Sequence, residues 1–308
     1  MKAPSRGKKR PDRSSRAAPR AARATAKVHA RHRNSRAAAG STPLASPRPA
    51  PGGPAAYLYG IVKWPLPWAA TPDDVGRSVG AGVGEPPGTV TAVPHRGLAA
   101  MISRVHPASI GSGQGVRGLR RDMRAHANVL NRIVALGGTV LPAAFGLMFP
   151  QADLLAARFL EPQYATLAAQ TARLEDAVEV TLKAAYVEAR AIQDVVAESP
   201  QLSVAVGRRG RSLDSKIELG RKVALALRAK RDRDARLLVS ALSPAARDVK
   251  VGNPAADTVV LNASFLVPRK SMPDFDRALE EVSRAARGRL QFDCVGPLPP
   301  YSFVDLRL

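Results

Sequence analysis

The chain has 308 residues, of which 45% are hydrophobic, and a formal net charge of +22. This length and apolar content predict about two domains, each with its own core. Residues 1–56 hold 14 Lys or Arg and one acid, Asp12, so they carry +13 of the charge and leave +9 for the rest. The single cysteine, Cys294, excludes an internal disulfide. No apolar run is long enough for a membrane span, and the N-terminus lacks the apolar segment of a secretory signal.

These features predict a cytoplasmic protein with no membrane contact. Residues 1–56 are rich in Arg, Lys, Ala, Pro and Ser and have no aromatic residue, so we expect a disordered basic tail. Such a tail would contact nucleic acid non-specifically, with a steep dependence on salt. A solvated extension without a dedicated partner is an equally weighted interpretation.

Residues 57–150 are predicted to form an N-terminal α+β domain with a small mixed sheet. A strand is expected from Tyr57 to Val62, followed by a proline-rich loop that holds both tryptophans, Trp64 and Trp68. These rings either cover the domain's own core or anchor a partner. Residues 89–93 and 98–105 flank a short turn and predict a β-hairpin.

A glycine-rich stretch at 110–118 resembles a phosphate-binding loop only superficially, because it lacks the Walker ending and the dinucleotide spacing. We interpret it as a linker before a helix over 117–136. Leu119, Met123, Leu130 and Ile133 are expected on the apolar face of this helix. His126 lies on that stripe and is predicted to be a hydrogen-bonded core histidine, not a metal ligand.

Residues 140–150, V-L-P-A-A-F-G-L-M-F-P, are the longest uncharged apolar run of the folded part. Pro142 removes a backbone donor and Gly146 weakens a central strand, so an edge strand or packed linker is favoured. We call this segment the seam, and we expect both halves of the protein to pack against it.

Residues 151–308 are predicted to form a ferredoxin-like βαββαβ domain with connecting helices. Alternating patterns predict strands, a capping box at Ser215 and Glu218 begins a long helix, and residues 199–212 are expected to be a loop. The strands are expected at 178–184, 246–251, 259–267 and 290–294, and the second helix at 273–286.

One face of this sheet should be covered by both helices, with Cys294 as an inert thiol in that core. The other face should expose polar side chains, either to solvent or toward the first half: Glu179, Thr181, Lys183, Asn262, Ser264, Gln291 and Asp293. The proline-rich residues 296–304 are expected to lie extended along a surface without joining a sheet.

The sequence contains none of the local motifs typical of hydrolases, metalloproteases, redox enzymes or nucleotide-binding proteins. No catalytic residue, cofactor or metal site is predicted. The competing class is a nucleic-acid-binding protein acting through the basic tail. The polar sheet face argues against it, since its positions include no aromatic residue on which a base could stack.

Several motifs resemble those of the gas vesicle protein GvpL/GvpF family. They are Tyr57-Leu58-Tyr59-Gly60-Ile61-Val62, His126 with Val129-Leu130, Val140-Leu141-Pro142 with Phe145-Gly146, Val260-Leu261-Asn262 with Phe265-Leu266-Val267, and Gly296-Pro297 with Pro299-Pro300-Tyr301-Ser302-Phe303. The chain departs from the family pattern at Leu298, where the family usually has Trp, and at Ala144, where it usually has Arg.

The resemblance implies a non-enzymatic accessory or minor structural protein of gas vesicles. Its expected partners are the hydrophobic shell protein GvpA and other gas vesicle accessory proteins. An aromatic, proline-stiffened surface can shield an apolar shell subunit without chemistry. The side chains predicted to contact a partner are Phe149, Tyr301, Phe303, Trp64 and Trp68.

Overall fold

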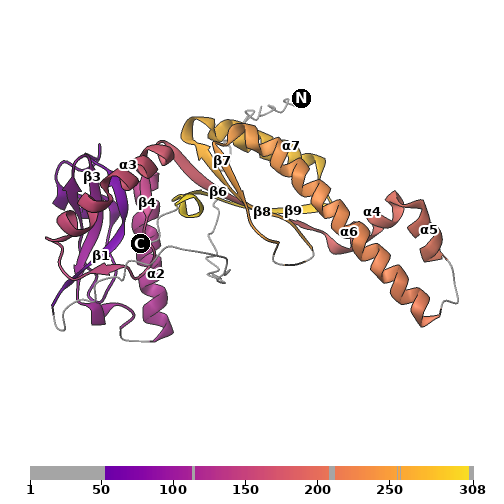
Figure 1. The fold of residues 1–308 in the computed structure, drawn as a ribbon, viewed down its shortest axis with the longest axis horizontal. Coiled ribbons are helices and arrows are strands. Elements are labelled where there is room, and N and C mark those ends of the chain that lie inside the picture. The colour runs from indigo at the N-terminus through magenta and orange to yellow at the C-terminus, as the bar shows by residue number, and fades with distance from the viewer. Residues whose placement is uncertain (1–52, 113–114, 208–211, 255, 257, 305–308) are drawn as a thin grey trace, which may run out of the picture. The chain divides into compact units, whose positions relative to one another are not determined.

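The computed structural model describes residues 53–112, 115–207, 212–254, 256 and 258–304. These residues form a mixed α+β structure with two antiparallel sheets (Figure 1). All of them belong to one compact unit, Ser41–Leu308. The predicted basic tail lies almost entirely outside the described residues.

The first sheet is centred on strand β1, Ala55–Lys63. Its neighbours follow the order β2-β3-β1-β4, and β5 also pairs with β1. The remaining strands are β2 (Val90–His95), β3 (Leu98–Val105), β4 (Val140–Pro142) and β5 (Met148–Phe149). The predicted hairpin is confirmed as β2 and β3. The seam contributes β4 at the sheet edge, as Pro142 and Gly146 predicted.

Strand β1 is apolar on both faces because helices cover both sides of the sheet. Tyr57 and Tyr59 face a core that includes helix α2, Val116–Ala135. Leu58 and Ile61 face a second core that includes helix α3, Glu161–Leu174. Gly60 permits the pairing with β4, since a Cβ there would lie 2.5 Å from the carbonyl oxygen of Leu141.

The first half of helix α2 presents a different face to the core from the predicted one. Leu119 and Met123 are 44% and 37% exposed, whereas Asp122 is buried at 1% exposure. Leu130 and Ile133 are buried as predicted. The apolar stripe therefore lies in the core only over its second half. In the first half Asp122 is buried instead, because backbone amides from other segments bond to its carboxylate. Hydrophobic periodicity within the helix does not reveal such partners.

The second sheet has the strand order β7-β8-β6-β9 with antiparallel pairing throughout. Its strands are β6 (Ala177–Tyr186), β7 (Asp248–Val251), β8 (Val259–Pro268) and β9 (Leu290–Leu298). Helices α6 (Leu213–Leu242) and α7 (Met272–Ala285) pack on one face through Leu238, Leu242 and Phe275. The predicted strands and both helices are therefore present.

Three local predictions for this half were wrong. Residues 199–212 were expected to be a loop, but helix α5 occupies Pro200–Gly207 after helix α4, Glu188–Glu198. The long helix starts earlier than Ser215, because Ser212 caps it by accepting from the Ser215 amide. Residues 296–298 join the sheet as the end of β9, where an edge position tolerates Pro297.

Short helical segments complete the structure. Helix α1 is Val75–Val79, and a π-helical turn at Ala156–Leu160 leads into α3. The 3₁₀ turns are Pro72–Asp74, Pro107–Ser109, Ser243–Ala245, Arg269–Ser271 and, as η6, Tyr301–Phe303. Helix α3, which the sequence assigned to the second half, packs on β1 and β4.

We expect a chain that starts at Gly53 to fold without the basic tail. Every residue of the three apolar cores in the described part comes from Ala55 onward, so the truncation removes none of them. Thermal melts of the full and truncated chains should be similarly cooperative. A cut after residue 56 is the informative control, because it deletes Ala55 and Ala56, which are 1% and 0% exposed. A molten or insoluble chain from Gly53 would contradict this prediction.

Candidate partner-binding surfaces

A buried pair of polar rings connects β1, α2 and the seam. The Tyr57 hydroxyl donates to Nδ1 of His126 at 2.8 Å and accepts from the Gly146 amide at 3.2 Å. The backbone of Ala143 also interacts with the His126 ring. Tyr57 is 0% and His126 4% exposed. The sequence prediction of a hydrogen-bonded core histidine is confirmed.

Both members of this pair are neutral at physiological pH. Burial lowers the pKa of His126 to about 4, although the bond to Ala143 acts in the opposite direction. Burial also raises the pKa of Tyr57 far above its ordinary range. A neutral His126 has one donor and one acceptor nitrogen, and the Tyr57 hydroxyl donates to the acceptor. The arrangement therefore ties the seam, through Gly146, to β1 and α2.

Asp122 binds one backbone amide of the glycine-rich stretch at 110–118. Its carboxylate accepts from the amides of Gly84 at 3.0 Å and Gly111 at 2.6 Å, and from the guanidinium of Arg121. Burial acts to raise the pKa of Asp122, but these donors outweigh it and hold the pKa below its usual value. A backbone amide that a phosphate would need is thus already bonded; residues 113–114 lie outside the described part.

The C-terminal turn η6 covers part of the polar face of the second sheet. Glu179, predicted to be exposed, is 3% exposed. Its carboxylate accepts from the amide of Ser302 at 2.8 Å and from the Ser302 hydroxyl at 2.6 Å. The same hydroxyl lies 3.0 Å from Ser264 Oγ. The face is therefore docked by the chain's own C-terminal segment, while Lys183, Gln291 and Asp293 remain exposed.

The five predicted contact residues lie in different environments. Phe303 is 0% exposed and packs in the core that also holds Leu58 and Leu266. Phe149 is half-buried, with its ring centroid 5.0 Å from that of Phe159. Trp64 and Trp68 are half-buried against the core on the α2 side of the first sheet.

Tyr301 has the largest exposed fraction of the five, at 44%. Loss of hydration and the nearby charge of Glu179 raise the pKa of its hydroxyl to about 12, so it is neutral. Its ring precedes the bonded Ser302 and follows two prolines, which restricts its backbone. Of the predicted residues, Tyr301 is therefore the best placed to meet a partner.

Cys294 does not lie in the helix-covered core, as the sequence predicted, but is exposed on edge strand β9. Alternation gave the correct side of the strand, since Cys294 pairs with the core residue Leu182. The neighbouring helices do not cover the edge at this point. Partial loss of hydration and the charges of Asp276 and Asp293 raise the pKa of its thiol to about 11. The thiol is therefore protonated and weakly nucleophilic at neutral pH.

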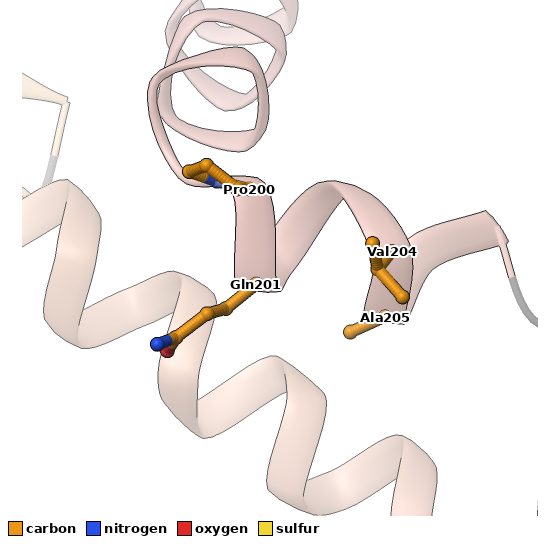
Figure 2. Close-up of a pocket in the computed structure, with 4 residues that line it drawn as sticks. All are labelled: Pro200, Gln201, Val204 and Ala205. Carbon is orange, nitrogen blue, oxygen red and sulfur yellow. The ribbon is translucent and has the colours of Figure 1, made fainter.

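Two surface hollows of the described residues differ in their lining. One of about 480 Å³ includes Arg121, Asp122 and Arg124 beside α2. The other, of about 420 Å³, is lined by Pro200, Gln201, Val204 and Ala205 of α5, without an ionisable side chain (Figure 2). In the part of the chain that the structure describes, no cluster of His, Cys, Asp or Glu could hold a metal ion. No helix there is long and apolar enough to span a membrane.

The exposure of apolar side chains on α5 and α6 was not predicted from the sequence. Val204 and Val206 of α5 are 60% and 52% exposed. Leu213 and Ile217 of α6 are 73% and 62% exposed. The sequence pattern places Ile217, Gly220, Ala224 and Leu227 on one face of the long helix, but it does not show that the first part of this face is exposed.

A family model described as "Gas vesicle synthesis protein GvpL/GvpF" matches residues 55–305, so the chain belongs to this family of gas vesicle proteins. The resemblance noted in the sequence is thus confirmed. The chain is 34% identical over 255 residues to gas vesicle protein F of Streptomyces sp. (strain CB03234), covering 81% of this chain and 99% of that protein. Gas vesicle protein F of Dolichospermum flosaquae is 25% identical over 192 residues, covering 61% of this chain and 78% of that protein.

Solved structures support the fold. The crystal structure of GvpF from Anabaena sp. PCC7120 superposes with a TM-score of 0.68 at 20% identity, and covers 82% of this chain and 99% of that one. GvpF from Microcystis aeruginosa superposes with a TM-score of 0.63 at 21% identity, with the same coverage.

Acidification should remove the stability that His126 contributes. In the unfolded chain the imidazole of His126 is protonated below about pH 6.5, its ordinary pKa. In the folded chain the same imidazole is protonated only near its lowered pKa of about 4. The contribution is fully present above pH 6.5 and is lost as the pH falls through 4, by roughly 3 kcal/mol. Urea unfolding across this window should show a flatter profile for His126→Gln, whose side chain stays uncharged. The same pH profile in both proteins would show that the imidazole is not held neutral.

Proposed function

We propose that this chain binds the gas vesicle shell protein GvpA and supports gas vesicle assembly without catalysing a reaction. The observation that carries the proposal is the family match across residues 55–305. In the cell, such a protein would act in the cytoplasm and at the gas vesicle. Other gas vesicle accessory proteins are the further partners that we propose.

The chemistry of the described residues supports a binding role. The buried ionisable groups His126 and Asp122 are each bonded to donors or acceptors of the same chain. A shell protein with apolar surface needs a partner that shields that surface before assembly. Exposed aromatic side chains can provide such shielding by excluding water, and this requires no reactive group.

We propose that the contact surface includes Tyr301 and the tryptophan loop of Trp64 and Trp68. Tyr301 offers an exposed ring on a segment whose backbone is held by prolines and by the Ser302–Glu179 bonds, so docking it orders few additional groups. Trp64 and Trp68 are half-buried residues of one proline-rich loop. Phe149 and Phe303 pack in the core on the α3 side of the first sheet.

We further propose that the architecture comprises two domains, 57–150 and 151–308, the second a ferredoxin-like variant with connecting helices. The strand order β7-β8-β6-β9 with a helix after β6 and another after β8 supports the second assignment. Helices α4 and α5 are additions to that pattern. The packing of α3 on the first sheet means that residues 161–174 bridge the proposed domains.

The contact surface can be tested by measuring stability and binding for the same variants. Tyr301→Ala should weaken binding of purified shell protein by about 1–4 kcal/mol, as loss of an interface aromatic does, with little change in unfolding. Phe303→Ala should cost about 3–5 kcal/mol of stability, because its ring is fully buried. Leu237→Ala is the matched control, since Leu237 is 68% exposed on α6 and outside the proposed surface.

Titration of the nuclease-treated full chain with shell protein tests both the contact surface and the proposed function. Normal shell binding by Tyr301→Ala and by a Trp64→Ala, Trp68→Ala variant would exclude this surface. Failure of the unaltered chain to bind shell protein at all would overturn the proposed function.

A further inference from the structure

The first half of helix α6 exposes a continuous apolar stripe. Leu213 and Ile217 are 73% and 62% exposed. Gly220 and Ala224, both exposed, continue the same face at steps of 3 and 4 residues. This spacing is that of the contact seam in a two-helix coiled coil. The series next reaches Leu227, which packs against the chain's own core. The stripe is therefore covered by the protein at one end and left open at the other.

No contact among the described residues accounts for a glycine at position 220. Glycine in the interior of an exposed helix destabilises it relative to alanine. A Cβ at Gly220 would meet no atom within 4 Å. Packing within the chain therefore does not require glycine at this position. A helix approaching from outside would require it, since the absence of a side chain lets two backbones come close.

We propose that the exposed stripe of α6 pairs antiparallel with the same stripe of a second copy of this chain. In this arrangement Leu213 lies opposite the second copy's Ala224, and Ile217 lies opposite its Gly220. Each large side chain thus faces a small one, and the two-fold axis repeats both layers. Complementary large and small residues across facing layers give the dense packing that stable helix pairs need.

The flanking charges favour this orientation. Asp214 and Arg221 lie on one edge of the stripe, and antiparallel pairing places Asp214 beside the second copy's Arg221, twice by symmetry. Arg221 bonds Glu218 of its own helix at 2.9 and 3.0 Å, so its guanidinium would lie between two carboxylates. On the other edge, Lys216 meets the aliphatic Val223.

Parallel pairing is disfavoured by the same residues. It would set Gly220 opposite Gly220 and Ala224 opposite Ala224, which leaves gaps in two layers. It would also bring Lys216 near the second copy's Arg221, a pair of like charges. The inference stands apart from the shell-protein contact, because it uses none of the residues of the proposed shell-binding surface.

Sedimentation velocity of the full chain over a range of concentrations tests the pairing, at a salt concentration that prevents nucleic-acid retention. We expect a reversible dimer. Ile217→Lys should raise its dissociation constant by at least about tenfold, since a charge would replace a buried side chain. Leu225→Lys is the matched control: Leu225 is 56% exposed on the same helix but off the stripe. This variant should dimerise within about twofold of the unaltered chain.

A charge exchange tests the orientation. Asp214→Arg and Arg221→Asp should each weaken the dimer, and the double variant should recover it because the two charges are then exchanged in both copies. A chain that is monomeric at every concentration overturns the proposal. So does equal weakening by Ile217→Lys and Leu225→Lys, or a double variant weaker than either single one. Shell-protein binding measured on the same variants is expected to be unchanged, which separates this proposal from the proposed function.

Discussion

The neutral hydrogen-bonded pair of Tyr57 and His126 is the constraint on which the first half of the structure depends. The two rings come from the central strand and from α2, and together they contact the amide of Gly146 and the backbone of Ala143. A short apolar segment such as the seam makes few sheet bonds of its own. These buried bonds fix where the seam turns between β4 and β5, and so which apolar side chains reach each core.

The second half is closed by a different polar contact, between Glu179 and Ser302. It holds η6 on the open face of the second sheet and thereby delivers Phe303 into a core shared with β1 and α3. The guanidinium of Arg269 adds a bond to the carbonyl of Val134 at 2.8 Å. The same anchoring leaves Tyr301 exposed beside a rigid support. The turn η6 therefore both stabilises the fold, through Ser302 and Phe303, and carries Tyr301 of the proposed binding surface.

Local periodicity was sufficient to predict much of this fold. The two strands at 57–62 and 259–267, the 117–136 helix and the core role of His126 follow from patterns within single elements. Local periodicity could not predict hydrogen bonds between residues that are distant in sequence. Asp122 is buried because Gly84 and Gly111 bring donors to it, and Glu179 because Ser302 returns over the sheet. The prediction that Cys294 is buried was wrong for a related reason. Alternation predicts which face of the sheet a side chain lies on, but it does not predict whether a helix covers that face at the edge strand β9.

Tyr57 and His126 act as one unit in stabilising the first half of the structure. A double-mutant cycle with Tyr57→Phe and His126→Leu, followed by urea unfolding at pH 7, tests this coupling most directly. Each single variant leaves the other group without its partner, so the double variant should lose less than the sum of the two. We expect a coupling energy between the two side chains of about 0.5–3 kcal/mol. Losses that add to within about 0.5 kcal/mol would contradict it, because groups that add in this way do not interact.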